Sequence, residues 1–241
     1  MHSQSLTPEL DMQNVISLFT NVFRIPVGEV IFFNIPSFES AIRGIGRCEE
    51  ALVKEQFYKR VPSFVNLNRD SARISNAQLN CLMENVKPTV DFQMKVLVEH
   101  GSRCDIGLDC DTILIHDSHW MTRRSFLNSR FSTLNLYQSE LTGPDYIEFV
   151  KLWMNSYDTR LKCVVASGEK PLAGFEHHQL PTMNWDETRR GKVHYSKIYE
   201  SGFDVSGGWD IERNDGLLAT FQFIGKIFLM VVWHDRFPKA P

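Results

Sequence analysis

Residues 133–153 read TLNLYQSELTGPDYIEFVKLW, and this stretch decides the expected fold. Its first part, Thr133–Tyr137, is apolar, β-branched and aromatic, which predicts a short buried strand. Thr142 has the side chain of a helix N-cap, Pro144 lies early in the first turn, and Asp145 occupies the N3 position, where it complements the helix dipole. The apolar residues that follow recur at helical spacing: Tyr146, Phe149, Val150 and Trp153. The expected unit is therefore a strand followed by a capped, amphipathic helix.

The same plan occurs at two earlier places in the chain. Ser75 and Gln78 form a capping-box pattern, and Ile74 and Leu79 are placed as its hydrophobic staple. A second helix start has Thr122 as the cap with Met121 and Phe126 as the staple. A predicted strand precedes each capped helix: Phe64–Leu67, Thr112–His116 and Thr133–Tyr137. Two further predicted strands, Asp91–Val98 and Leu161–Ala166, lack an equally clear helix after them. The centres of the five strands are 21–28 residues apart in the sequence, close to the period of leucine-rich-type repeats.

These units predict an α/β fold, an irregular leucine-rich-repeat-like strand–helix solenoid over residues 12–167. One unit cannot bury both of its faces, so neighbouring units must cover each other. Parallel strands joined by helical crossovers follow from that stacking. We expect the region to begin with an amphipathic helix at 12–24 and a strand at Glu29–Asn34, each ended by a proline.

The last third of the chain, residues 168–235, has a different pattern. Residues 168–208 predict a long, partly irregular segment. The chain then gives three predicted strands, Trp209–Arg213, Leu217–Ile224 and Ile227–Trp233, with Asn214-Asp215-Gly216 as a tight turn. We expect this antiparallel β-meander to cap the open end of the solenoid and to form one continuous domain with it.

Composition and charge narrow the classes of protein. The chain has 241 residues, 43% hydrophobic and 23% charged, with a net charge of −3, which is typical of a folded domain and not of a nucleic-acid binder. Neither a secretory signal nor an apolar run long enough to span a bilayer is found. The five cysteines are scattered, which favours free thiols in the cytoplasm or nucleus.

No pattern of a known catalytic or phosphate-binding site occurs. Gly44 and Gly46 form the nearest glycine pair, but a third glycine and a preceding strand are missing. We therefore expect no enzyme, no catalytic residue and no cofactor. A small α/β hydrolase or transferase without a recognisable motif is the alternative from another class.

Two groups of residues carry metal-ligand side chains without metal-ligand spacing. The first group contains His177, His178, Asp186 and His194. The second contains Cys104 and Cys110, which are farther apart than in zinc knuckles, near His100 and His116. Surface polar residues and free thiols are the preferred interpretation, so no metal is predicted.

The loop that follows the Thr112–His116 strand carries candidate partner-contact residues. His116, His119 and Trp120 lie together there, and binding residues collect on loops along one rim of a solenoid. Tryptophan is also enriched at interface hot spots. Trp153, Trp209 and Trp233, in contrast, are predicted to be core residues because their apolar spacing already explains them.

Two separated segments resemble the nematode F-box-associated domain of type 2. The first is Ser139–Trp153 with Arg160-Leu161, which is similar to the family's S-x-L-T-x-x-D-L-N-x-F-L-K-x-W … R-L stretch. The second is Gly207–Thr220, which is similar to G-G-x-D-I-x-R-x-D-G-x-x-A-T. Residues 75–86 and 112–127 also fit, so the resemblance covers the chain from about residue 60 onward.

The resemblance implies a substrate receptor. In such proteins an F-box binds the linker subunit of a cullin–RING ubiquitin ligase and the associated region captures an unknown target protein. We find no F-box, because the helix expected at 12–24 already matches the region behind it. The alternative is therefore a regulatory paralogue that competes for targets without recruiting the linker subunit. Nucleic acid and membranes are not expected as partners.

Overall fold

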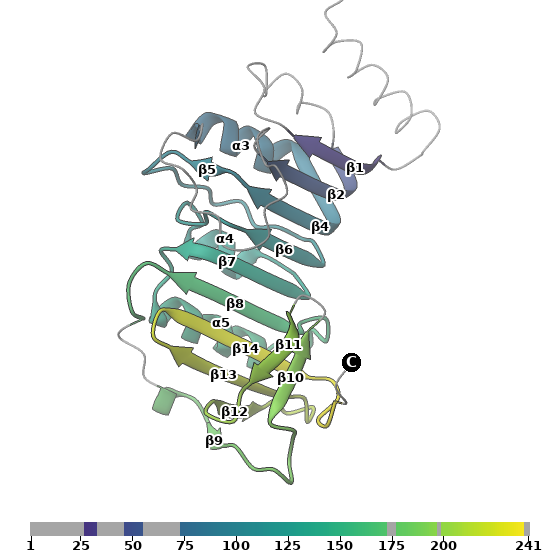
Figure 1. Cartoon of the computed structure of the whole chain (residues 1–241), viewed down its shortest axis with the longest axis vertical. Helices are drawn as coiled ribbons and strands as arrows, with labels where there is room; N and C mark the ends of the chain where they lie inside the picture. The colour runs from purple at the N-terminus through teal and green to yellow at the C-terminus, as the bar shows by residue number, and fades with distance from the viewer. Residues whose placement is uncertain (1–26, 33–45, 55–72, 173–176, 197–198, 239–241) are drawn as a thin grey trace, which may run out of the picture. The chain divides into compact units, whose positions relative to one another are not determined.

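The computed structural model describes residues 27–32, 46–54, 73–172, 177–196 and 199–238. The chain divides into two compact units, residues 1–130 and residues 131–241. Figure 1 shows strands as the main element of both units. The helix expected at 12–24 and the strand expected at Phe64–Leu67 lie outside the described residues.

The first unit contains a parallel sheet. Its strands are hydrogen-bonded in the order β1 (Val27–Phe32), β2 (Gly46–Lys54), β4 (Val86–Lys95) and β6 (Thr112–Ile115). The buried residues Phe92 and Met94 of β4 and Ile113 and Ile115 of β6 alternate with partly exposed ones, as a pleated strand requires. A separate short pair, β3 (Arg73–Ile74) and β5 (Leu97–Val98), is also parallel.

Two helices accompany this sheet, and both begin at the predicted caps. Helix α3 (Asn76–Asn85) has the predicted capping box: Gln78 N donates to Ser75 Oγ at 3.2 Å, and Ser75 N donates to Gln78 Oε1 at 2.9 Å. Helix α4 (Arg123–Asn128) is shorter, and its cap Thr122 accepts a hydrogen bond from Ser125 N at 3.1 Å. The caps satisfy amide groups that a helix cannot pair internally.

The second unit contains a mixed sheet. Its strand order is β7 (Thr133–Ser139), β8 (Cys163–Gly168), β14 (Ile227–Trp233), β13 (Leu218–Ile224), β12 (Trp209–Glu212) and β9 (Met183–Asn184). Strands β7 and β8 are parallel, and every later pair is antiparallel. Helix α5 (Gly143–Met154) connects β7 to β8, and its residue Tyr146 stacks on Phe228 with ring centroids 4.4 Å apart. One face of the sheet is thus covered by α5.

The opposite face of the second sheet is covered by strands. Strands β10 (Val193–Ser196) and β11 (Tyr199–Asp204) form an antiparallel pair that is drawn over the sheet in Figure 1. Phe203 and Val205 pack against a cluster contributed by the sheet. The buried members of the cluster from the sheet are Cys163, Leu218, Leu229, Val231 and Trp233. A 3-10 turn, η2 (His177–Gln179), precedes β9.

The predicted strand–helix solenoid is wrong, because the described residues are mostly sheet with only three α-helices. Between β4 and β6, residues 96–111 form β5 and loops in place of a crossover helix. Loop amides there pair with other segments: Cys104 N donates to the Trp120 carbonyl and Cys110 N to the Arg130 carbonyl. Strand spacing counts only chain length, and it does not distinguish a helical crossover from a loop whose backbone is satisfied elsewhere.

The β-meander of the last third is confirmed, but its placement differs from the expected cap. Strand β14 pairs directly with β8 through five residue pairs, including Phe228 with Ala166. The meander therefore continues the sheet of the second unit as antiparallel strands. The segment predicted to be irregular, 168–208, contributes β9, β10 and β11. None of the helices in the described ranges is long and apolar enough to cross a membrane.

Candidate functional site

The loop that follows β6 holds a buried polar clamp. Asp117 Oδ2 accepts a hydrogen bond from Val98 N at 2.8 Å, and Asp117 Oδ1 lies 2.6 Å from His119 Nδ1. The other ring nitrogen of His119 is 3.2 Å from the carbonyl oxygen of Glu99. Both Asp117 and His119 are buried. The clamp therefore fastens the end of β5 to the end of β6 inside the first unit.

The three residues predicted to contact a partner, His116, His119 and Trp120, differ in their burial and in their relation to this clamp. His119 is one of its members, while His116 is half-buried at the end of β6. Burial, with a smaller contribution from Lys95, lowers the pKa of His116. Trp120 is fully buried and its indole nitrogen has no hydrogen-bond partner. Trp120 offers no surface to a partner in this conformation, and contact by His116 and His119 stays a prediction.

The residues considered as metal ligands do not come together in the described part of the chain, where no group of three or more His, Cys, Asp and Glu side chains could hold an ion. Cys104 and Cys110 are buried and form no disulfide, and burial raises the pKa of Cys104. Asp186 instead accepts hydrogen bonds from the backbone and hydroxyl of Thr188. His194 packs edge-on against a tryptophan in the second unit.

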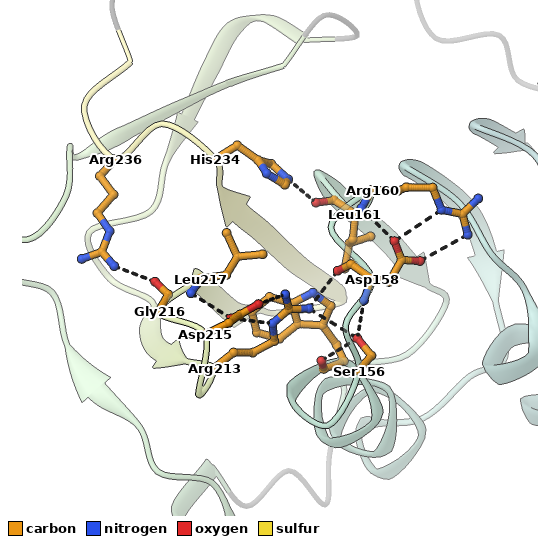
Figure 2. A network of polar contacts seen from close by, with 11 residues as sticks. Ser156, Asp158, Arg160, Leu161, Arg213, Asp215, Gly216, Leu217, His234 and Arg236 are labelled. Carbon is orange, nitrogen blue, oxygen red and sulfur yellow. Dashed lines mark hydrogen bonds and ion pairs between the residues drawn. The ribbon is translucent and has the colours of Figure 1, made fainter.

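A polar network that joins sequence-distant segments surrounds Arg213, at the end of β12 (Figure 2). Its Nε donates to Asp215 Oδ1 at 3.1 Å, and its Nη2 pairs with Asp215 Oδ2, which gives a bidentate ion pair. Its Nη1 donates to the Asp158 carbonyl at 2.8 Å and to Ser156 Oγ at 3.4 Å. The guanidinium carbon also lies 5.1 Å from the ring centroid of Trp153, within the range of a cation–π contact.

Arg213 thus joins a turn and a loop that are far apart in sequence. The turn is Asn214-Asp215-Gly216, where Gly216 has the positive φ, +83°, expected of this turn. Hydrogen bonds from Arg213 and from the Leu217 amide hold the pKa of Asp215 below its usual range. The loop is the connection between α5 and β8, which begins at Asn155.

Further contacts support the same turn and loop (Figure 2). Arg236 Nη2 donates to the Gly216 carbonyl at 2.7 Å. His234 Nε2 lies 2.7 Å from the Leu161 carbonyl oxygen. On the loop, Arg160 forms an exposed ion pair with Asp158 at 3.2 Å. Both ends of the loop are therefore tied to the C-terminal strands of the second unit.

A second buried arginine lies on the other side of β12. Arg190 and Asp210 form an ion pair at 2.8 Å with both side chains fully buried. Asp210 Oδ1 also accepts a hydrogen bond from Thr220 Oγ1 at 2.7 Å. The Thr220 hydroxyl in turn accepts a hydrogen bond from Trp233 Nε1 at 2.8 Å. Arg190 Nη2 donates in addition to the Val205 carbonyl at 3.0 Å. This network ties the β10–β11 side of the unit to the sheet.

Beside Arg213 the surface of the second unit has a cleft of about 330 Å³. Its polar lining comes from α5, from η2 and from the end of β12. The polar residues that line it are Lys151, Asn155, Gln179, Glu212, Arg213 and Asn214. This cleft was not predictable from local sequence patterns, since its residues come from three separated segments. The Gly207–Thr220 motif was the available signal, because it contains Glu212, Arg213 and Asn214, which line the cleft.

The fold and these networks define a sheet-rich protein. Among the described residues, the buried side chains of His119, Arg190 and Arg213 each pair with an aspartate of the same chain. Residues 104–165 match the model of the F-box associated family. The chain is also 27% identical over 140 residues to an uncharacterized protein of Caenorhabditis elegans, a match that covers 55% of this chain and 33% of that protein. No solved structure matches the chain.

These matches confirm the resemblance: residues 104–165 are similar to the F-box associated family, and the similar protein comes from a nematode. The match over residues 104–165 indicates a protein-interaction role of the kind found in F-box protein families. The chain spans about a third of the length of the Caenorhabditis elegans relative. The matched region contains β6, α4, β7, α5 and the loop between α5 and β8.

Proposed function

We propose that this chain is a target-recognition domain of the kind that serves F-box ubiquitin ligases, and that it binds its target without a catalytic step. The observation that carries the proposal is the family match over residues 104–165. In an F-box receptor the associated region captures the protein that the ligase modifies. The activity and partners of the whole protein are part of the same proposal.

The polar groups of the second unit support a binding role over a catalytic one. Arg190 and Arg213 are its two buried guanidinium groups among the described residues, and both are engaged by carboxylates and backbone carbonyls of the chain itself. An active site in contrast leaves charged groups directed at a space where a substrate can lie. Here the charges fix loops and strands, which suits a surface that must keep its shape for a partner.

Affinity capture tests the proposal. The whole chain, tagged and folded, is incubated with a native nematode lysate, and bound proteins are identified by mass spectrometry. We expect one or a few specific proteins that are competed by untagged chain. Expression of the chain fused behind an F-box should then lower the abundance of those proteins and raise their ubiquitination.

The matched control is a chain with Asp210→Ala, which leaves the buried Arg190 guanidinium without its carboxylate. A partner that recognises the folded surface is lost with this variant, whereas chaperones are enriched by it. Recovery of chaperones alone by the unaltered chain would contradict the proposal. Stable abundance of every captured protein in the fusion experiment would argue against the ligase role while leaving protein binding in place.

A further inference from the structure

We infer that the α5–β8 loop and the adjacent cleft form a docking site for an extended peptide segment that carries an acidic side chain. The inference rests on the proposed function and names the surface of the second unit that would perform it. Its elements are the exposed side chain of Tyr157, the fixed backbone on both sides of Tyr157, and the amide and ammonium groups of the cleft.

Tyr157 is 92% exposed, the largest value among the exposed large apolar and aromatic side chains of the described residues. A tyrosine combines a large apolar ring with a hydroxyl and has few rotatable bonds, so it contributes contact area at low entropic cost. Tyrosine is correspondingly enriched among residues that dominate binding energy at interfaces. An isolated exposed apolar residue is common on protein surfaces, and Tyr157 differs from such residues in how its loop is held.

The residues on either side of Tyr157, Ser156 and Asp158, both accept hydrogen bonds from the buried Arg213 (Figure 2). Before it, Ser156 Oγ donates to the Trp153 carbonyl at 2.8 Å and accepts from Arg213. After it, the Asp158 carbonyl accepts from the same guanidinium at 2.8 Å. Because Arg213 is itself held by the carboxylate of Asp215, the loop is ordered before a partner arrives. Pre-ordering removes part of the entropic cost of binding.

The cleft lies next to this loop, since Asn155 lines it two residues before Tyr157. Among its amide side chains, Asn155 donates to the Lys151 carbonyl and Gln179 accepts from the Lys151 ammonium group. Together Asn155, Gln179 and Asn214 bring both donor and acceptor groups to the lining. That combination matches the alternating carbonyl and N–H groups of an extended peptide backbone. Met154, Leu180 and Pro181 supply the apolar part of the lining. Its volume of about 330 Å³ lies at the lower end of the range of ligand sites and leaves room for a few peptide side chains.

The charge of the cleft selects an acidic partner. Arg213 is neutralised by Asp215, and Glu212 accepts from Arg236 at 2.9 Å. Lys151 differs, because its Nζ donates at 3.1 Å to the neutral amide oxygen of Gln179. Among the described residues that line the cleft, Lys151 is thus the cation without a carboxylate partner. An aspartate or glutamate of the bound segment supplies that carboxylate.

The experiment selects peptides from a displayed library of random short sequences on the whole folded chain. The selected peptides are then measured against three variants by fluorescence anisotropy. We expect enrichment of aspartate or glutamate, and a loss of affinity of about tenfold or more for Tyr157→Ala and for Lys151→Glu. A second selection on Lys151→Glu should enrich lysine or arginine in place of the acidic residue. Tyr137→Ala, at another exposed tyrosine of the same unit, is the matched control and should bind the first peptides unchanged.

The outcomes separate the inference from the proposed function. Peptides that bind all variants equally would overturn the inference and place recognition on another surface. A library that yields no binder, or an unchanged preference on Lys151→Glu, would overturn it as well. The proposed function itself fails only when the capture from lysate returns no specific partner. Both altered residues lie at the surface, and an unchanged melting temperature shows that each variant is folded.

Discussion

At the scale of single residues, the two buried arginines of the second unit differ in their access to water. Arg190 and its partner Asp210 are both fully buried, whereas Arg213 is buried and its partner Asp215 is 40% exposed. Two charges removed from water are tolerated only while both are present, because one left alone pays the full desolvation cost. The Arg190–Asp210 pair should therefore be the more sensitive of the two to a single substitution.

Replacement of one member of that pair gives the first prediction. Arg190→Met should lower the free energy of unfolding by about 3–5 kcal/mol, because the Asp210 carboxylate then lies buried beside only the Thr220 hydroxyl. The double variant Arg190→Met, Asp210→Leu should be more stable than either single variant, since it removes both charges. Urea denaturation of the four proteins measures the coupling. Additive losses in the double variant would show that the pair is not coupled.

His194 gives a second prediction, on the effect of pH. Burial, with a smaller contribution from His234, lowers the pKa of His194 to about 4, while a hydrogen bond with the Val232 carbonyl raises it. The unfolded chain has a histidine pKa near 6.5 and therefore binds more protons between about pH 4 and 6.5. The folded state should lose up to about 3 kcal/mol as the pH falls through that window.

The change His194→Phe tests this pH effect. The ring remains against Trp233, which His194 contacts with a centroid distance of 5.3 Å, while the titrating group is removed. Unfolding free energies at several pH values should give a shallower dependence between pH 6.5 and 4 for the variant. Parallel curves for the two proteins would assign the dependence to other groups. Asp204, whose pKa is lowered to about 2 by Ser206 and Lys192, titrates below this window.

At the scale of elements, helix starts were predictable from sequence because a cap is a local device. Ser75, Thr122 and Thr142 all occupy the N-cap positions expected of them. The cap of α5 has its own geometry: Asp145 Oδ2 accepts from both Thr142 N at 2.8 Å and Thr142 Oγ1 at 2.7 Å. These bonds join residues three apart, so no knowledge of the remaining fold is needed to predict them.

The burial of charge along β12 was not predictable in the same way. In the sequence, Trp209, Ile211 and Arg213 alternate with Asp210 and Glu212, a pattern that would place the two sets on opposite faces of the strand, one toward the core and one toward solvent. In the structure Ile211, Asp210 and Arg213 are all buried and Glu212 is exposed. The sheet is covered on both faces here, so alternation no longer separates core from solvent. The partner that makes burial of Asp210 possible, Arg190, lies 20 residues away, beyond any local pattern.

An irregularity in β7 gives a third prediction. Gln138 has φ of +55°, and the pairing of β7 with β8 shifts register between Leu136 and Ser139. A side chain is strained in this left-handed region and glycine is not. Gln138→Gly should therefore be more stable than Gln138→Ala by about 0.5–1 kcal/mol. Chemical denaturation compares the two, and an alanine variant of equal or higher stability would contradict the strain.

At the scale of the whole molecule, the prediction of a solenoid was wrong because strand spacing gives neither the kind of connection between strands nor their direction. Strands β4 and β6 have a spacing near that of a repeat, although loops and not a helix connect them. The spacing also does not indicate whether β13 and β14 are parallel or antiparallel. The direction of strands β12, β13 and β14 was indicated by the turns between them. Gly216 and Gly225 lie in these turns, both have positive φ, and the strands that the turns join are antiparallel. The meander was therefore predicted correctly, whereas its pairing with β8 required long-range contacts.

Thiol reactivity gives a fourth prediction, for the folded chain as a whole. Cys104, Cys110 and Cys163 are buried, and burial raises the pKa of Cys163 to about 12. Thiolate is the reactive form, so these cysteines should react with a disulfide reagent only after unfolding. In a Cys48→Ser variant, the half-buried Cys81 should be the fastest-reacting thiol. Mass spectrometry of labelled peptides identifies the order, and rapid native labelling of Cys163 would contradict the buried placement.

The Arg213 contacts also have a consequence for the order in which the molecule is made. Arg213 follows Ser156 by 57 residues, so the ribosome has synthesised Tyr157 and all of β8 well before the guanidinium that secures the loop. During that interval helix α5 can form, but the loop after it lacks its anchor. A nascent chain is therefore unable to present the ordered loop to a partner. At the docking site inferred above, binding of the peptide therefore requires that the C-terminal strands of the second unit have folded.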